Sequence, residues 1–454
     1  MYAVTNPVDG TLIQQFPTMT DSEVVCAVDK AQEAYLSWSR LDLEVRAAKM
    51  KRVAELFSER TEEFATKMSR EMGKRLGDAR GEMGVVCDIF SYYAENAHQL
   101  LADEDFVISG GKGTIHKTAV GVILGIMPWN YPVYQVARFV APNLILGNTV
   151  LLKHAPICPE TALAIEKLMH DAGVLDGVYV NVFASNEQAA AIIADPRVQG
   201  VSLTGSERAG AAVAAEAGKH LKKVVLELGG SDPMVVLDSD DLPALAKRAA
   251  EVRLENMGQA CNAPKRMIVM HDIYPDFLAE LVNDFKTYTP GDPLDETTTL
   301  APLSTRAAAE RVLEQLNRAK EQGAVIECGG KMIEGPGAYF EATVITGVTP
   351  DMDIHHEEVF GPVAIVYSAS DENHALELAN DTPFGLGSSV FATDPARAMS
   401  FGRQVEAGMV YVNNVGGSQA DLPFGGVKRS GIGRELGYLG IEEFMNKQVI
   451  RVLD

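Results

Sequence analysis

The chain has 454 residues, 46% of them hydrophobic and 22% charged, so it is long enough for two or three domains with large cores. Its 40 basic and 62 acidic side chains give a formal net charge of −22 at pH 7. Because phosphate binding requires a basic surface and no block of Lys or Arg occurs, nucleic acid is not expected as a partner. The most apolar region, residues 119–152, is interrupted by polar residues, so no membrane span is expected.

The five cysteines are odd in number, scattered, and not arranged as a paired metal or redox motif. This pattern is typical of a reducing compartment. The N-terminus lacks the basic segment followed by an apolar one that marks secretion. We therefore expect a cytoplasmic protein with no metal site.

Helices are expected in the first hundred residues. Thr20 and Glu23 fit a capping box, and apolar residues then recur three and four positions apart. Further helices are expected over 42–72 and 81–101. Residues 106–116 instead form two short extended pieces around a glycine-rich turn, which predicts a β-hairpin that packs against the body or another subunit.

From residue 119 strands alternate with helices. This alternation predicts an α/β fold with a doubly wound parallel sheet, covered by helices on both faces, whose ligands lie at the carboxyl ends of the strands. The expected strands are 120–127, 149–153, 178–182, 198–204 and 223–228. A looser alternation follows, with strands expected at 234–237, 266–270, 339–344, 363–367, 388–391 and 409–412.

The most informative stretch is Gly258-Gln259-Ala260-Cys261, which presents one thiol among small residues. An earlier apolar run ends in Glu227 and two glycines, and it predicts a buried strand that delivers a carboxylate to a site. A thiol and a carboxylate on two such loops suit covalent catalysis, in which the thiolate attacks a carbonyl and the carboxylate later activates water. The alternative is that Cys261 is a small buried apolar residue, as most free cysteines are.

Other polar residues also follow expected strands. Thr204-Gly205-Ser206 opens a helix, and a glycine-led turn there offers backbone N–H groups to a dinucleotide pyrophosphate, although it is not the usual Gly-x-Gly-x-x-Gly fingerprint. Lys153 ends one strand and Pro128-Trp129-Asn130 follows another. Each also has a structural alternative. Gly205 could mark a tight bend, Lys153 could be a solvated charge, and Trp129 with Asn130 could form a packed turn.

Together these residues resemble the aldehyde dehydrogenase superfamily over nearly the whole chain. The stretches in that family's order and spacing are Pro128-Trp129-Asn130, Thr204-Gly205-Ser206, Glu227-Leu228-Gly229-Gly230, Gly258-Gln259-Ala260-Cys261, Glu358-Val359-Phe360-Gly361-Pro362, Asn380-Asp381-Thr382-Pro383-Phe384-Gly385-Leu386 and Pro423-Phe424-Gly425-Gly426. The resemblance implies a dinucleotide-binding domain, a catalytic domain and a small β flap that joins subunits into a homodimer or homotetramer. The implied ranges are 1–102 and 118–229, 230–428, and 103–117 with 436–454.

The resemblance also implies the roles of individual residues. Cys261 would be the nucleophile, the Asn130 amide and the Cys261 backbone N–H the oxyanion hole, and Glu227 the base for thioester hydrolysis. One oxyanion donor is typically worth about 3 kcal/mol of barrier. After hydride transfer to a nicotinamide, a thioester would remain. The implied cofactor residues are Trp129, Lys153, Gly205, Ser206, Leu228, Glu358 and Phe360.

One departure from the family concerns the cofactor. Many NAD-preferring relatives have a glutamate three positions after the lysine, where this chain has Pro156. A carboxylate there would repel a 2′-phosphate, so its absence removes a barrier to NADP. We expect NADP or NAD as cofactor, with NADP accepted.

In three stretches, 128–132 with Arg138, 152–156 and 226–232, the sequence looks most like succinate-semialdehyde dehydrogenases of the shorter bacterial type. Arg138 matches an arginine that meets the substrate carboxylate in such enzymes and could bind it bidentately, although an ion pair on a helix surface is the alternative. Glu255 stands where several of them carry another arginine, and it could favour an amino-aldehyde. The implied substrate residues are Arg138, Tyr134, Glu255 and Ser418.

Three functions therefore stay open. The first is NAD(P)-dependent oxidation of succinate semialdehyde to succinate. The second is the same reaction on another small aliphatic or amino-aldehyde. The third is a non-catalytic binding or structural protein of the same fold.

Overall fold

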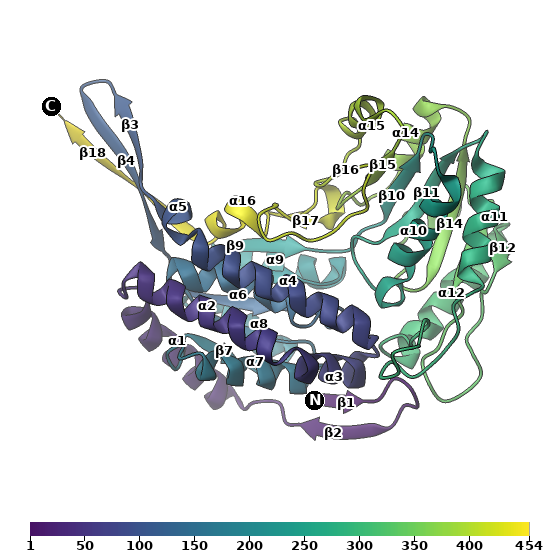
Figure 1. Ribbon diagram of the computed structural model, residues 1–454. Helices are drawn as coiled ribbons and strands as arrows, with labels where there is room; N and C mark the ends of the chain where they lie inside the picture. The colour runs from purple at the N-terminus through teal and green to yellow at the C-terminus, as the bar shows by residue number, and fades with distance from the viewer. Residues whose placement is uncertain (454) are drawn as a thin grey trace.

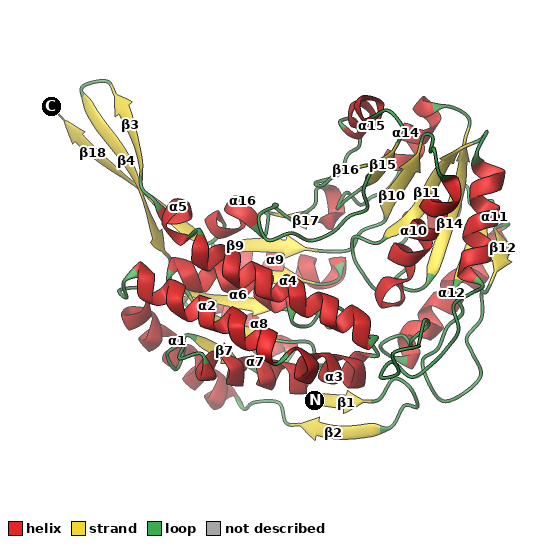
Figure 2. Cartoon of the chain, viewed as in Figure 1, coloured by secondary structure: helices red, strands yellow, loops and turns green. Residues whose placement is uncertain are grey.

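Two α/β bodies and one projecting β arm make up the computed structural model, which describes residues 1–453 (Figure 1). Each body is built on its own sheet, with helices packed around it (Figure 2). Among these residues, no helix combines the length and the apolar character needed to cross a membrane.

The first sheet has the order β17-β9-β8-β5-β6-β7. Its parallel strands confirm the five expected ones: β5 (Val122–Ile126), β6 (Thr149–Lys153), β7 (Tyr179–Asn181), β8 (Val198–Thr204) and β9 (Lys223–Glu227). The short β17 (Gly431–Ile432) returns from the C-terminal part of the chain and pairs antiparallel with β9. The strand order reverses between β5 and β8, which is where doubly wound sheets bind ligands.

Helices cover both faces of this sheet, as expected. Val122 and Leu124 of β5 pack into one core, whereas Ile123 between them packs into another. The first core includes α1 (Asp21–Trp38), α8 (Asn186–Ala194) and α9 (Glu207–Lys219). The second includes α2 (Leu43–Glu59), α3 (Thr61–Met72), α4 (Leu76–Glu95), α6 (Tyr134–Leu146) and α7 (Pro159–Asp171).

The N-terminal helices agree with the predictions in part. The capping box of Thr20 and Glu23 is confirmed. The single helix expected over 42–72 is wrong, because the backbone leaves the helical conformation at Arg60 and separates α2 from α3. The helix expected from residue 81 begins at Leu76, and a short α5 (Ala97–Leu101) follows it. The N-terminal pair β1 (Tyr2–Thr5) and β2 (Leu12–Phe16) was not predicted.

The second sheet has the order β12-β13-β14-β11-β10-β15-β16, with only β12 antiparallel to its neighbour. Its strands are β10 (Asp232–Val236), β11 (Pro264–Met270), β12 (Val325–Cys328), β13 (Thr343–Thr346), β14 (Val363–Ala369), β15 (Ser389–Phe391) and β16 (Tyr411–Val412). The helices of this part are α10 (Leu242–Leu254), α11 (Tyr274–Phe285), α12 (Arg306–Gln322), α13 (Asp353–His356), α14 (Glu372–Asn380) and α15 (Pro395–Gly402). The expected strand at 339–344 is displaced, since β13 starts at Thr343.

The predicted hairpin is confirmed as β3 (Glu104–Ile108) and β4 (Gly111–Ala119), and it forms the projecting arm (Figure 1). The C-terminal strand β18 (Met445–Leu453) pairs with β4 along its whole length. The three strands extend away from both bodies, so the two faces of the arm meet little of the rest of the chain.

The two bodies meet at a double-glycine link. β9 ends at Glu227, and β10 begins at Asp232. Gly229 and Gly230 fill the gap with no room for side chains, because a Cβ on either would lie 2.5 Å from an oxygen of Glu358 or Cys261. The carboxyl ends of the first sheet are thereby held against the start of the second.

Candidate active site

The loop that carries Cys261 follows α10 through a tight turn, η1 (Glu255–Gly258). Asn256, Met257 and Gly258 adopt φ values of 46°, 59° and 70° in succession, a left-handed conformation that is costly for residues other than glycine. The turn is held by the Asn256 side chain, whose Nδ2 donates to the carbonyl oxygen of Asn130 at 2.9 Å. The loop after β5 and the thiol loop are therefore fixed to each other.

Cys261 lines two cavities. One, of about 510 Å³, lies beside α4, α6 and α10, and we call it the helix-side cavity. The other, of about 370 Å³, lies at the carboxyl ends of β5, β8 and β9 and against α12, and we call it the strand-end cavity. Gln135 is the other side chain that lines both. One cysteine residue thus borders two separate spaces.

Asn130 lines the strand-end cavity together with Cys261. Its Nδ2 donates to the carbonyl oxygen of Gln259 at 3.1 Å, which leaves the second N–H of the amide for another acceptor. The Gln259 side chain is itself fixed, because its Oε1 accepts from the Ser304 backbone at 3.0 Å. The amide is therefore held in place and can donate to an oxyanion formed at Cys261.

The thiol is protonated at neutral pH in this arrangement. Burial raises the pKa of Cys261 to about 12, although the positive charges of Arg138 and Lys265 oppose the increase. A nucleophilic thiolate must therefore be generated at the moment of reaction.

Glu227 lies at the end of β9 with only 1% of its surface exposed. Burial raises its carboxyl pKa well above the ordinary value, despite the nearby charge of Arg138. Within residues 1–453, neither carboxylate oxygen has a hydrogen-bond partner. The side chain points toward Gly425, where a Cβ would lie 2.6 Å from its Oε1. An unpartnered carboxyl group has no hydrogen bond to break if its side chain turns toward a neighbouring site.

The strand-end cavity has the features of a dinucleotide site. Gly205 and Ser206 lead into α9, and Ser206 caps that helix, so backbone N–H groups point to the cavity. The Glu358 carboxylate lines the same space and is held by the Gly230 N–H at 3.1 Å. Trp129 and Phe360 form an aromatic edge with ring centroids 5.8 Å apart. A helix N-terminus, a carboxylate and an aromatic wall fit a pyrophosphate, a ribose and a nicotinamide ring.

The helix-side cavity contains more charge. Arg75 pairs with Asp78 at 2.7 Å. Glu82 pairs with the buried Lys74, and Arg248 lies 3.4 Å from Glu251. Most of its charges are therefore neutralised within the cavity wall.

Two neutral hydroxyl groups and one carboxylate complete this wall. Tyr134 and Ser418 place their hydroxyl oxygens 2.7 Å apart. Glu255 accepts from the Tyr131 hydroxyl at 3.0 Å, and among the described residues it has no cationic partner. It is therefore a carboxylate without a direct counter-ion, whose pKa burial raises and the more distant charges of Lys74 and Arg75 lower.

Comparison with known proteins agrees with this geometry. The model of the family described as "Aldehyde dehydrogenase family" matches residues 1–450. The chain belongs to the aldehyde dehydrogenase family. It is 49% identical over 450 residues to a succinate-semialdehyde dehydrogenase (NADP(+)) of Deinococcus radiodurans, covering 99% of this chain and 94% of that relative.

Solved aldehyde dehydrogenases share the whole fold. The crystal structure of succinic semialdehyde dehydrogenase from Streptococcus pyogenes in complex with NADP+ has a TM-score of 0.98 at 41% identity, and all of both chains is covered. Betaine aldehyde dehydrogenase from Staphylococcus aureus in complex with NAD+ has a TM-score of 0.95 at 30% identity, covering 99% of this chain and 91% of that one. The predicted α/β fold is confirmed.

The structure places the predicted residues of this aldehyde dehydrogenase in three groups. Those that line the strand-end cavity are Asn130, Cys261, Trp129, Gly205, Ser206, Leu228, Glu358 and Phe360. Those that line the helix-side cavity with Cys261 are Tyr134, Glu255 and Ser418. Glu227, Lys153 and Arg138 lie outside both linings. Lys153 is buried at the end of β6, with its Nζ 5.9 Å from the centre of the Tyr2 ring.

Arg138 is placed differently from the expectation that it faces the substrate directly. It is fully buried, and its Nε pairs with Glu435. Its Nη1 donates to the Tyr134 hydroxyl at 3.3 Å, and its Nη2 to the Thr204 hydroxyl at 3.2 Å. The alternative, an ion pair on the helix surface, is also wrong, because the Arg138–Glu435 pair is buried. Arg138 acts on the helix-side cavity through Tyr134.

Sequence reasoning missed several cavity residues. Arg311 and Gln315 of α12 line the strand-end cavity, and Asp78, Arg248 and Glu251 line the other. Charged residues on amphipathic helices have no local signal that distinguishes a cavity wall from a solvated face. Their positions depend on packing between distant segments.

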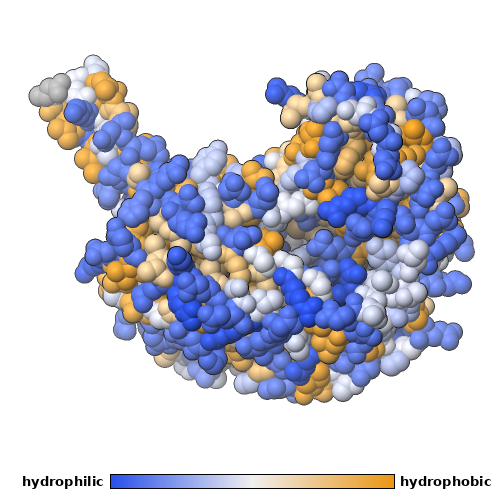
Figure 3. Space-filling view, viewed as in Figure 1, coloured by the Kyte–Doolittle hydropathy of each residue, from blue (hydrophilic) through white to orange (hydrophobic). Residues whose placement is uncertain are grey.

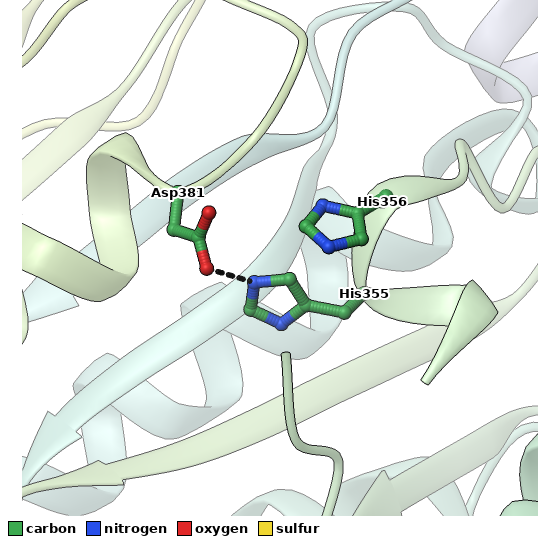
Figure 4. Close-up of side chains that lie close together, drawn as sticks. All are labelled: His355, His356 and Asp381. Atoms are coloured by element: carbon green, nitrogen blue, oxygen red, sulfur yellow. Dashed lines mark hydrogen bonds and ion pairs between the residues drawn. The ribbon is translucent and has the colours of Figure 1, made fainter. Parts of the chain in front are cut away.

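One cluster outside the two cavities joins His355, His356 and Asp381 (Figure 4). Both ring nitrogens of the buried His355 are already used, one with Asp381 and one with the Tyr367 hydroxyl, each at 3.1 Å. His356 uses its Nε2 with the carbonyl oxygen of Pro350 at 3.0 Å. These bonds anchor α13, which leads directly to Glu357 and Glu358.

Proposed function

We propose that this chain catalyses NADP-dependent oxidation of a small aldehyde to the acid, with succinate semialdehyde as the leading substrate. The observation that carries the proposal is the position of Cys261, which lines both cavities. A dehydrogenase that works through a thioester requires an aldehyde on one side of its nucleophile and a cofactor on the other. A purely structural or binding protein of the same fold would not require this arrangement.

In the first step the Cys261 thiol releases its proton to water and the sulfur attacks the aldehyde carbon. A C–S bond forms, the π bond of the carbonyl breaks, and an oxyanion results. The free N–H of Asn130 and the Cys261 backbone N–H stabilise that oxyanion, each with a contribution of about 3 kcal/mol. When bound, the cofactor supplies the hydride acceptor. Loss of hydride from the hemithioacetal leaves a thioester on Cys261.

Thioester hydrolysis then requires a base, and Glu227 is the candidate. Burial raises the pKa of its carboxyl group, so its carboxylate is a stronger base toward water than an exposed one. Both of its oxygens are free of hydrogen-bond partners in the described chain, so no bond has to break before the side chain turns. The water oxygen attacks the acyl carbon, the C–S bond breaks, and the acid leaves.

The cofactor would be held by Gly205 and Ser206 at the pyrophosphate, by Glu358 at a ribose and by Phe360 at the nicotinamide. NADP is favoured because Pro156 replaces a carboxylate, and because Lys153 has no ion-pair partner in residues 1–453. A buried lysine without a carboxylate partner suits a 2′-phosphate. The Deinococcus and Streptococcus relatives carry NADP in their names, which supports the same choice.

For the substrate, the hydroxyl pair of Tyr134 and Ser418 is the proposed anchor of the distal carboxylate. Arg138 donates to the Tyr134 oxygen from behind, so the phenol proton is directed away from it and toward the cavity. A carboxylate that displaced the hydrogen bond between the two hydroxyls would then accept one hydrogen bond from each, without meeting the guanidinium itself. The relatives named as succinate-semialdehyde dehydrogenases support this substrate.

One observation favours a second candidate. Glu255 is a carboxylate without a direct counter-ion in the helix-side cavity, and its partner is the neutral Tyr131 hydroxyl. A cationic amino-aldehyde would neutralise that charge, whereas succinate semialdehyde would be repelled by it. Small amino-aldehydes are therefore the competing substrate class.

We also propose that the arm joins two copies of this chain. Val107 is 89% exposed and Val449 is 67% exposed, and apolar side chains run along the arm (Figure 3). Exposed apolar strands of this kind are covered in stable proteins. A homo-oligomer in the reducing cytoplasm, where all five cysteines stay free, is the assembly we propose.

The deciding experiment measures kcat/KM for a panel of aldehydes with both cofactors. The panel contains succinate semialdehyde, 4-aminobutanal and hexanal, which differ in the charge at the distal end. The proposal expects succinate semialdehyde with NADP to give the highest value. A higher value for 4-aminobutanal would favour the second candidate, and no turnover of any aldehyde would reject catalysis.

A further inference from the structure

Lys265 is a buried lysine four residues after Cys261, at the start of β11. Its Nζ donates to the carbonyl oxygen of Ala260 at 2.8 Å and to that of Cys261 at 2.7 Å. The same nitrogen lies 3.4 Å from Oε1 of Glu358. One ammonium group therefore joins the thiol loop to a carboxylate of the strand-end cavity.

The Lys265 ammonium group is well compensated at this junction. A buried ammonium group is costly unless it is hydrogen-bonded and paired, and here two N–H groups donate to the loop carbonyls while Glu358 is the ion-pair partner. Burial lowers the pKa of Lys265, whereas the negative charge of Glu358 opposes that change. Glu358 is held from its other side by the Gly230 N–H at 3.1 Å. The Lys265 ammonium group therefore sets the positions of both the Cys261 loop and the Glu358 carboxylate.

We infer that Lys265 is a positioning residue, which fixes the Cys261 loop relative to Glu358 and supplies positive charge beside the thiolate. The inference rests on the proposed roles of Cys261 and Glu358. If the ammonium is lost, two buried carbonyl groups lose their donor and Glu358 loses its counter-charge. Thiol reactivity and cofactor binding should then fall together. Aldehyde binding should change little, because Lys265 lies outside the lining of the helix-side cavity.

The charge of Lys265 acts on the thiol together with three other groups. Arg138 also lowers the pKa of Cys261, whereas Glu358 and Glu227 raise it. Arg138 is already neutralised by Glu435, to which its Nε is paired. Lys265 shares its charge with Glu358 across 3.4 Å, and it is the cation bonded directly to the loop of the nucleophile. Its removal should therefore change the reactivity of the thiol at a given pH.

The test uses two variants that separate charge from hydrogen bonding. Lys265→Met removes both, whereas Lys265→Gln retains an N–H donor for the loop carbonyls. The first measurement is the rate of iodoacetamide labelling of the Cys261 peptide against pH, in the cofactor-free enzyme. Both variants should label about tenfold more slowly at neutral pH, because one pKa unit changes the thiolate fraction tenfold.

The second measurement separates the KM values. For Lys265→Met we expect KM for NADP to rise about fivefold, with KM for the aldehyde within about twofold of wild type. Lys265→Gln should show the smaller increase in the KM for NADP. If Lys265→Met does not fold, the labelling profile of Lys265→Gln decides alone.

The matched control is Arg266→Lys. Arg266 is the neighbouring buried cation, and it donates to the carbonyl oxygens of Ser231, Leu378 and Ala379, outside the thiol loop. This variant should lower Tm without moving the labelling profile. Wild-type labelling and KM values in Lys265→Met, or equal changes in the control, would overturn the inference. Failure of the proposed function would look different, since the wild-type chain would then turn over no aldehyde or Cys261→Ser would retain turnover.

Discussion

The two cavities that meet at Cys261 are built in opposite ways. One side of the strand-end cavity is formed by loops that follow the parallel strands of the first sheet, with Asn130, Gly205 and Leu228 each within a few residues of a strand end, and α12 closes the other side. The helix-side cavity is assembled from helices and loops distant in the sequence, including α4, α6 and α10. The fold fixes the first, and side-chain packing fixes the second.

Their electrostatics differ in the same way. In the strand-end cavity, backbone N–H groups and the single carboxylate of Glu358 are available to a ligand. In the helix-side cavity, charged groups are mostly paired with each other, and Glu255 remains without a direct counter-ion. The strand-end cavity therefore suits one fixed type of ligand. The ligand preference of the helix-side cavity can change when a single charged side chain is substituted. Cofactor chemistry and substrate choice are thereby separated.

The largest effect is expected at the residue that both cavities share. Cys261→Ser should reduce kcat/KM at least about ten-thousandfold for every aldehyde, because the serine hydroxyl is a far weaker nucleophile without a dedicated base. Binding of NADP, measured by fluorescence titration, should change less than about threefold. Cys26→Ser, at an exposed position, is the control. If the serine variant retains full turnover, the two cavities do not meet at the reacting residue.

The second prediction concerns the wall between the cavities, where Arg138 is paired with Glu435. Arg138→Met should lower the free energy of unfolding by about 3–5 kcal/mol, because it leaves a buried carboxylate without its partner. The double variant Arg138→Met with Glu435→Gln should recover much of that loss. Urea unfolding measures both. Equal stability of the single variant and wild type would show that the pair does not support the wall.

The contrast between the cavities also explains what the sequence could predict. Asn130, Gly205 and Glu227 were predictable because the carboxyl ends of parallel strands meet at one edge, so each residue could be placed from its own strand. Arg138 could not be placed in the same way. Its partner Glu435 lies in a segment that returns to the first sheet through β17, and no local pattern indicates this return.

The break between α2 and α3 shows the same limit. It occurs at Arg60, where no glycine or proline marks it. The charged walls of the helix-side cavity were missed for the same reason, since Asp78 and Glu251 look like ordinary solvated residues on two separate helices. Local patterns therefore predicted the sheet and its loops better than the contacts between helices.

The third prediction concerns Glu227, which lines neither cavity although it is the proposed base. Glu227→Gln should reduce steady-state turnover about a hundredfold, within the range for loss of a general base. It should retain a burst of one reduced cofactor per subunit, because formation of the thioester does not require this base. Stopped-flow absorbance of the reduced cofactor separates the two phases. Loss of the burst would assign Glu227 to the first step instead.

The smallest effect is expected from the Glu255 carboxylate of the helix-side cavity. Glu255→Arg should change the ratio of kcat/KM for succinate semialdehyde to that for 4-aminobutanal about tenfold in favour of the anionic substrate, because a partly screened charge contributes about 1–2 kcal/mol. KM for NADP should not change, since Glu255 lies outside the strand-end lining. Tyr131→Phe is the matched control, because it removes the hydrogen bond to Glu255 and keeps the charge. If KM for NADP changed as much as the substrate preference, the two cavities would be coupled through more than the shared Cys261. Their separate construction would then not give them separate specificities.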